Sequence, residues 1–237
     1  MSDLKRLSLL SDYYEFTMAN GFYEAGLADR VACFDMFFRR VPDNGGFAIM
    51  AGLQQVIDYL KDLHFTAEEI SFLKGKGIFS DGFLDYLQNF QFCCDVWAVP
   101  EGTPVFPKEP ILTVRGPIVQ AAIIETMVLL CINHQSLVAT KANRIVRAAQ
   151  GRDVMEFGAR RAHGTAAAVY GARAAYIGGC AGTSCTLSDQ LFGVPAMGTM
   201  AHSWVQMFDS EYEAFCAYAR KYPNNCSLFV DTYNTLK

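Results

Sequence analysis

One of only four histidines in the chain, His202, lies in the stretch GVPAMGTMAHSWVQMF, residues 193–208. Its neighbours Gly198, Thr199 and Ala201 are small, so they leave space around the imidazole ring that a histidine packed in a core would rarely need. This combination of one histidine and several small residues therefore indicates a binding or catalytic site rather than core packing.

Two adjacent arginines, Arg160 and Arg161, lie in the stretch GARRAHG that follows the apolar segment DVMEF. A guanidinium group pairs bidentately with a carboxylate or a phosphate, so two arginines and a histidine predict an anionic substrate. Either arginine could instead form a surface ion pair. Phe157 fits core packing and a site equally well, and Tyr14, considered alone, fits core packing better.

The elements that would position these residues alternate between strand and helix after Gly151. Strands are predicted at 153–157, 180–184, 194–199 and 227–232, with helices at 164–177, 188–192 and 210–222 between them. This alternation is typical of parallel βαβ units, whose strands open at their carboxyl ends onto one face, where ligands bind. The residues expected to line that face are Arg160, Arg161, Ser184, His202, Ser203 and Asp231.

The first part of the chain has a mixed pattern. A helix is predicted from Ser11 or Asp12 to Gly26, a strand over 31–41 with a turn at 42–46, two helices over 53–65 and 66–77, and extended chain over 94–114. The second of these helices begins on a capping box formed by Thr66 and Glu69. One long helix from Pro117 to the stop at Gly151 then links two domains.

The predicted fold class is α/β, with an N-terminal α+β domain over residues 1–137 and the first part of an irregular parallel α/β barrel over residues 138–237. Four parallel strands cannot close an eight-stranded barrel, and the last strand would have a bare edge. We therefore expect the sequence to be the N-terminal part of a longer protein.

Charge and composition argue against a nucleic-acid-binding, membrane-spanning or secreted protein. The chain has 237 residues, a net charge of -4 and a pI near 5.6, with no basic stripe for nucleic acid. The apolar run at 121–132 is too short for a membrane span and contains Glu125. The N-terminus has no secretory apolar region, so a cytoplasmic location is expected.

Eight cysteines without zinc-ligand spacing predict buried reduced thiols and no metal site.

Five motifs, in order along the chain, resemble the nicotinate phosphoribosyltransferase family: LSDYYEFTMA, EFGARRAHG, GGCAGTSC, GVPAMGTMAHSWVQMF and LFVDTYNT. The resemblance implies a type II phosphoribosyltransferase fold and a homodimer with shared active sites. It also implies synthesis of nicotinate mononucleotide and pyrophosphate from nicotinate and phosphoribosyl pyrophosphate, coupled to ATP. The family's later arginine-aspartate-glycine segment and glycine-rich phosphate loops have no counterpart before Lys237, and the ligands of the Mg²⁺ that accompanies ATP are expected beyond it.

The resemblance also implies roles for single residues. His202 matches the histidine that ATP phosphorylates, and a neutral imidazole nitrogen is a competent nucleophile for that step. Phe157 and Tyr14 of the partner subunit match the aromatics that sandwich the pyridine ring. Arg160 matches the arginine near the nicotinate carboxylate. The other substrate-binding matches are Ser184, Gly198, Thr199, Ser203 and Asp231, of which Asp231 has no assigned role.

Two alternatives stay open. The first is nicotinamide phosphoribosyltransferase, which resembles this chain but carries an acid at the position of Ser184 to accept an amide N–H. An acid there would repel a carboxylate, so the hydroxyl favours nicotinate. The second is an inactive fragment that only dimerises.

Overall fold

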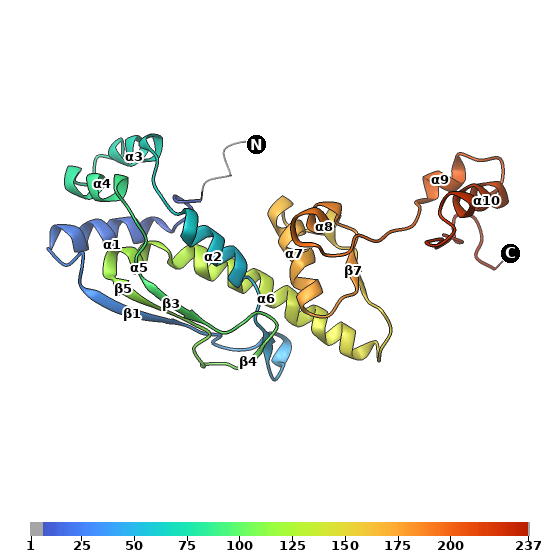
Figure 1. The fold of residues 1–237 in the computed structure, drawn as a ribbon, viewed down its shortest axis with the longest axis horizontal. Coiled ribbons are helices and arrows are strands. Elements are labelled where there is room, and N and C mark those ends of the chain that lie inside the picture. Colours follow the sequence, from blue (N-terminus) through green and yellow to red (C-terminus); the bar gives the residue numbers. More distant parts are fainter. Residues whose placement is uncertain (1–6, 237) are drawn as a thin grey trace.

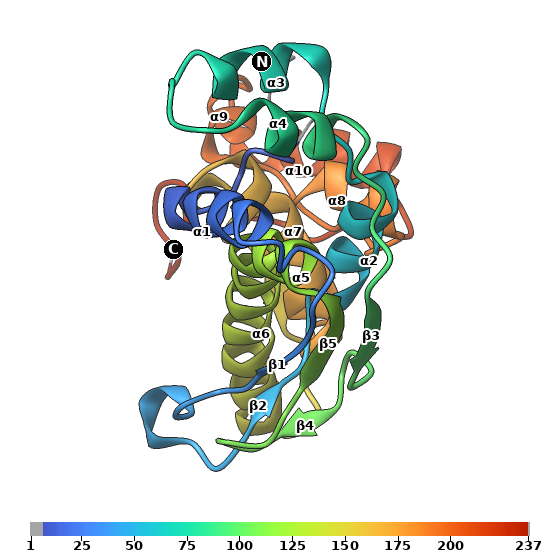
Figure 2. The ribbon, with the colours of Figure 1, turned by 90° about the vertical axis from the view of Figure 1, so that its left-hand side faces the viewer.

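The computed structural model describes residues 7–236, and its N-terminal half is built on a three-stranded antiparallel sheet of order β1-β5-β3. Figures 1 and 2 show the strands stacked beside the long helix α6. The elements of this half are α1 (Tyr13–Glu24), β1 (Val31–Met36), η2 (Pro42–Asn44), β2 (Ala48–Ile49), α2 (Leu53–Asp62), α3 (Ala67–Lys74), α4 (Asp81–Gln88), β3 (Asp95–Ala98), β4 (Pro104–Val105), β5 (Leu112–Pro117), α5 (Ile118–Ile123) and α6 (Glu125–Ala148).

A single large apolar core holds this half together. Phe83, Leu87, Met50 and Ile132 are each completely buried in it, and α5 packs against both β1 and β5. Local signals in the sequence agree with these elements. The predicted capping box at the start of α3 is confirmed: the Thr66 amide donates to Glu69 Oε2 at 2.7 Å, and the Glu69 amide donates to Thr66 Oγ1.

The predicted single helix from Pro117 to Gly151 is wrong, because the chain forms two helices that meet at Ile124. The buried carboxylate of Glu15 accepts hydrogen bonds from the Thr126 amide at 3.0 Å and the Thr126 hydroxyl at 2.8 Å. The Ser11 hydroxyl donates to the carbonyl of Ile123 at 2.8 Å. Side chains from the start of α1 thus satisfy backbone groups where one helix ends and the next begins. The uninterrupted periodicity of 117–150 gave no sign of this break.

The combined stretch Ile118–Ala148 is long and apolar enough to cross a membrane, but 56% of its most apolar window is buried inside the protein. It packs against α1, α2, β2 and α7. These contacts make it the core helix of the fold. The domain boundary expected after residue 137 falls within α6.

The C-terminal half begins with β6 (Met155–Glu156), η3 (Ala159–Arg161), α7 (Thr165–Ile177), β7 (Gly182–Thr183) and α8 (Thr186–Phe192). β6 and β7 are parallel, as the alternating pattern predicted. Figure 1 shows an extended connection running from this unit to α9 (His202–Gln206) and α10 (Glu211–Lys221), which lie apart from the rest.

Two of the four predicted strands need correction. Segment 194–199 contributes only one bridge, Thr183 with Ala196, and segment 227–232 forms no strand. The backbone of 227–232 makes no ladder with a neighbouring strand in the described chain. The Thr199 hydroxyl instead donates to the carbonyl of Ser227. A strand pattern becomes a strand only when a partner edge is present beside it.

The cysteines differ in part from the expectation. All eight are free, but only Cys131 and Cys180 are buried. Burial raises the pKa of the Cys131 thiol to about 12, which keeps it protonated at neutral pH. Cys33, Cys93 and Cys226 are exposed.

Candidate active site

The carboxyl end of β6 carries two of the predicted site residues. Phe157 follows the strand directly and is 51% exposed, and Arg160 lies in η3 with its side chain also exposed. The Ser184 amide donates to the carbonyl of Glu156 at 2.9 Å. The parallel pairing of β6 with β7 therefore brings Ser184 next to the end of β6, which Phe157 follows.

Arg161 has different surroundings from Arg160. It lines a cavity of about 570 Å³ between η3, α6 and α7, together with His134, His163 and Leu10, whereas neither Phe157 nor Arg160 lines it. Within residues 7–236, neither arginine forms an ion pair. The two arginines of the GARRAHG stretch thus differ in their surroundings, because only Arg161 lines this cavity.

His202 is the first residue of α9 and is exposed. Its Nδ1 lies 3.2 Å from Thr232 Oγ1, and its ring lies 4.2 Å from the ring of Phe229, centroid to centroid. The imidazole is therefore held by the C-terminal segment on one side and open to solvent on another. It is not a histidine packed in a core.

Gly198, four residues before His202, lies in open space. No atom lies within 4 Å of a Cβ built on Gly198, whose conformation does not require glycine. Ser203 is exposed beside His202 in α9, and Asp231 is exposed next to Thr232, the residue that contacts His202. Thr199 is tied to the same C-terminal segment through the carbonyl of Ser227.

Tyr14 lies on α1, far from these residues in the chain. It is 46% exposed, and its hydroxyl donates to Glu125 Oε1 at 3.2 Å. Partial burial and the nearby Glu125 carboxylate raise the pKa of the phenol above its usual value. Figure 1 places α1 and α9 at opposite ends of the molecule, so one chain does not bring Tyr14 and His202 together.

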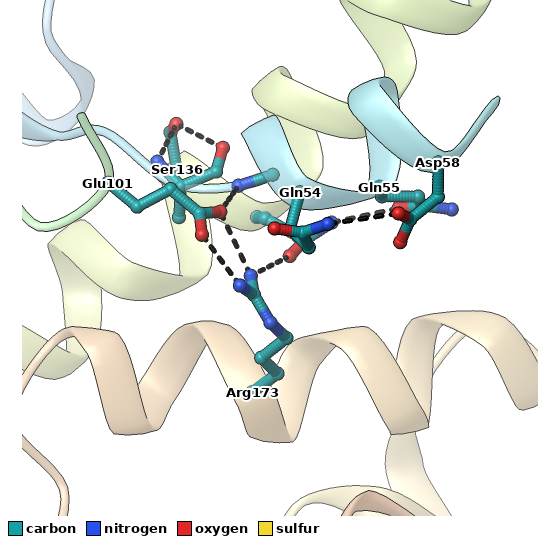
Figure 3. Close-up of polar contacts among 9 residues, drawn as sticks. Gln54, Gln55, Asp58, Glu101, Ser136 and Arg173 are labelled. Atoms are coloured by element: carbon teal, nitrogen blue, oxygen red, sulfur yellow. Dashed lines mark hydrogen bonds and ion pairs between the residues drawn. The ribbon is translucent and has the colours of Figure 1, made fainter. Parts of the chain in front are cut away.

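A buried polar network, which no motif in the sequence indicates, connects the two halves (Figure 3). Arg173 on α7 forms a bidentate pair with Glu101, at 2.9 Å and 2.6 Å, and also contacts Gln135 of α6 at 3.3 Å. The Gly52 amide at the start of α2 donates to Glu101 at 2.6 Å. The only signal in the sequence was an isolated arginine within the alanine-rich helix AAAVYGARAAYI.

The network shifts the ionisation of its carboxylate. Burial works against the charge of Glu101, but the hydrogen bonds and charge of Arg173 and the amides of Gly52 and Gln54 together hold its pKa below the ordinary value. Glu101 is therefore ionised at neutral pH. Through its pair with Arg173, Glu101 fixes α7, the helix that follows η3, against the N-terminal half.

Within residues 7–236, no group of three or more His, Cys, Asp or Glu side chains is placed to hold a metal ion. Asp231, the one acidic residue among the predicted site positions, is exposed.

Comparison with known proteins identifies relatives along nearly the whole chain. Residues 9–133 match the family described as the nicotinate phosphoribosyltransferase (NAPRTase) N-terminal domain. Nicotinate phosphoribosyltransferase pncB2 of Mycobacterium tuberculosis is 47% identical over 97% of this chain and 49% of its own length. Nicotinate phosphoribosyltransferase of Bacillus subtilis is 41% identical over 98% of this chain and 47% of its own length.

The fold is also that of solved relatives. Human nicotinic acid phosphoribosyltransferase superimposes with a TM-score of 0.85 at 30% identity, covering 95% of this chain and 55% of the human chain. Nicotinate-nucleotide pyrophosphorylase from Pyrococcus furiosus gives a TM-score of 0.72 at 26% identity, covering 95% of this chain and 51% of its own. This confirms the predicted fold class. The chain spans about half the length of the curated relatives it matches.

Proposed function

The chain belongs to the nicotinate phosphoribosyltransferase family, and on that premise we propose that the protein transfers a phosphoribosyl group to nicotinate in NAD biosynthesis. The observation that carries the proposal is the extent of the similarity. It covers 97% of the chain, and therefore both α1 and the β6–β7 unit that bears Phe157 and Ser184.

In the proposed reaction, the ring nitrogen of nicotinate forms a bond to C1 of phosphoribosyl pyrophosphate, and pyrophosphate leaves with the electrons of the broken C–O bond. The guanidinium of Arg160 pairs with the nicotinate carboxylate. Phe157 stacks on one face of the pyridine ring, and Ser184 offers a neutral hydroxyl near the carboxylate. An acid at position 184 would repel that anion.

Tyr14 completes the site from a second copy of the chain. Support comes from its place in this structure: it is exposed on α1, at the opposite end of the molecule from α9. An exposed aromatic residue on α1 is available to contact a ligand held on the β6–β7 unit of another chain. We therefore propose a homodimer with active sites shared between subunits.

His202 is proposed to take the γ-phosphoryl group of ATP. A neutral imidazole nitrogen attacks the γ-phosphorus, the bond to the bridging oxygen breaks, and ADP leaves. Exposure of the ring and the open space at Gly198 provide room for the phosphoryl group. Hydrolysis of the phosphohistidine would drive synthesis if the two states of the site differ in affinity for substrates. Mg²⁺ accompanies ATP in this proposal, and a cytoplasmic location stays a prediction.

The test is a turnover assay on the chain as its gene encodes it, with phosphoribosyl pyrophosphate, ATP and Mg²⁺. Nicotinate is expected to give nicotinate mononucleotide with a kcat/KM orders of magnitude above that for nicotinamide. Equal turnover of the two bases would contradict the assignment, and preference for nicotinamide would support the alternative enzyme. A folded dimer without turnover of either base would support a fragment that only dimerises.

A further inference from the structure

The residue before Phe157 closes a small turn around it. Glu156, the last residue of β6, accepts a hydrogen bond on Oε1 from the Gly158 amide at 2.5 Å. A side chain that binds the amide two positions further on fixes the residue between them. That residue is Phe157.

The glycine of this turn lets the Glu156 carboxylate approach closely, and its backbone angles do not require glycine. Gly158 has φ -89° and ψ -3°, which any residue can adopt. A Cβ at this position would lie 2.8 Å from Glu156 Oε1. A side chain at position 158 would therefore require the Glu156 carboxylate to shift from the position in which it accepts this hydrogen bond.

The end of β7 repeats the arrangement. Thr183, its last residue, accepts a hydrogen bond on Oγ1 from the Cys185 amide at 3.0 Å, which encloses Ser184. The Thr183 hydroxyl in turn donates to Glu156 Oε2 at 2.7 Å. The two turns are thus joined by one hydrogen bond between the side chains of residues paired across the parallel strands.

We propose that Glu156 and Thr183 are positioning residues that set the placement of Phe157 and Ser184 relative to each other at the nicotinate ring; this rests on the proposed function. Phe157 and Ser184 are both exposed, so core packing does not hold either of them. Thr183 is completely buried and Glu156 is partly buried, so the hydrogen bonds behind the site are shielded from competing water.

Glu156 and Thr183 lie on one face of the β6–β7 pair, because their side chains are hydrogen-bonded. Phe157 and Ser184 follow them directly, just beyond the strands, and both are exposed. One pair forms the support and the other pair forms the surface presented to a ligand.

The test uses Thr183→Val, which removes the hydroxyl and both of its hydrogen bonds while keeping the shape of the side chain. In the chain as its gene encodes it, the KM for nicotinate is expected to rise about 10-fold or more, because a misplaced ring contact costs binding and orientation. The KM for phosphoribosyl pyrophosphate is expected to stay within about two-fold of the parent value. Thr183→Ser, which keeps the hydroxyl, is expected to restore the nicotinate KM.

Thr113→Val is the matched control. It also removes a threonine hydroxyl that donates to a carboxylate, here Asp35 at 2.5 Å, but on the β1–β5 sheet. Its two KM values are expected to match those of the parent. If Thr183→Val does not fold, Glu156→Ala provides the same test, because it removes the acceptor for both the Gly158 amide and the Thr183 hydroxyl.

The possible outcomes distinguish a failure of the proposed function from a failure of the positioning role alone. A parent enzyme that does not use nicotinate would overturn the proposed function itself. A parent that uses nicotinate, together with a folded Thr183→Val variant of unchanged nicotinate KM, would overturn the positioning role alone. A parallel rise of both KM values would also overturn it, because that result indicates a general loss of structure.

Discussion

The guanidinium of Arg173 and the carboxylate of Glu101 form a bidentate ion pair between α7 and the loop before β4, with side chains only 16% and 19% exposed. A pair this buried is retained only when its remaining polar atoms are satisfied, and here the Gly52 amide and Gln135 satisfy them (Figure 3). The pair fixes α7, the helix that follows η3, against the N-terminal half.

Removing one partner of this pair should strongly destabilise the protein. Arg173→Met leaves the Glu101 carboxylate buried without its counterion, and we expect the free energy of unfolding to fall by roughly 3 kcal/mol, the lower end of the range for buried pairs. Urea unfolding followed by circular dichroism measures the change. The matched control is Lys74→Met, which breaks the exposed pair of Lys74 with Asp81 and should leave the midpoint nearly unchanged. Equal midpoints for the two variants would refute a structural role for Arg173.

Glu15 should contribute a pH-dependent cost to stability. Burial raises the pKa of its carboxyl, although hydrogen bonds from Ser11 and Thr126 partly oppose the rise. A carboxyl whose pKa is higher in the folded than in the unfolded state destabilises the fold when it is ionised, and this cost disappears below the unfolded pKa. The stability of Glu15→Gln relative to the parent should therefore be greatest near pH 7 and decline toward pH 4. Unfolding curves across this range test it, and a difference that does not vary with pH would contradict it.

Ser184 should determine which pyridine base is used. Ser184→Asp places a negative charge where the nicotinate carboxylate is proposed to bind, so we expect kcat/KM for nicotinate to fall by at least about 10-fold while that for nicotinamide falls less or rises. Steady-state kinetics with both bases give the ratio. Ser71→Asp, on the exposed side of α3, is the control for added charge. An unchanged ratio in Ser184→Asp would place Ser184 away from the ring substituent.

His202 should carry the phosphoryl group. Incubation with γ-labelled ATP is expected to give an acid-labile, base-stable label that His202→Ala lacks. The same variant should lose ATP hydrolysis and keep slow phosphoribosyl transfer, because the other substrate contacts remain. His64→Ala, at another exposed histidine, serves as the control and should label normally. Full labelling of His202→Ala would assign the phosphoryl group to another residue.

Residues 1–237 expressed alone should self-associate and show no measurable synthesis of nicotinate mononucleotide. Large apolar side chains are exposed on several elements, among them Phe34, Trp97, Leu130 and Met207. Apolar area of this kind contributes about 25 cal/mol per Å² when it is covered, so association is favoured. Light scattering and size-exclusion chromatography measure it. A monodisperse monomer with turnover would contradict this prediction.

The sequence by itself determined most of what local patterns control. Periodicity, composition and capping signals predicted α1, α2, α3, α7 and α10, and Thr66 with Glu69 predicted the start of α3. The polar residues after the strand patterns pointed to the segments that carry Phe157, Ser184 and His202. These signals are local in the chain, so they can be read without knowing what lies beside them in space.

The tertiary structure decided what depends on distant partners. The break at Ile124 arises from Ser11 and Glu15, more than a hundred residues away, and no periodicity within the helix encodes it. Segment 227–232 has a strand pattern but no neighbouring strand edge to pair with in the described chain. The support of Phe157 and Ser184 by Glu156 and Thr183 depends on the pairing of β6 with β7, because the two side chains meet only when their strands are adjacent.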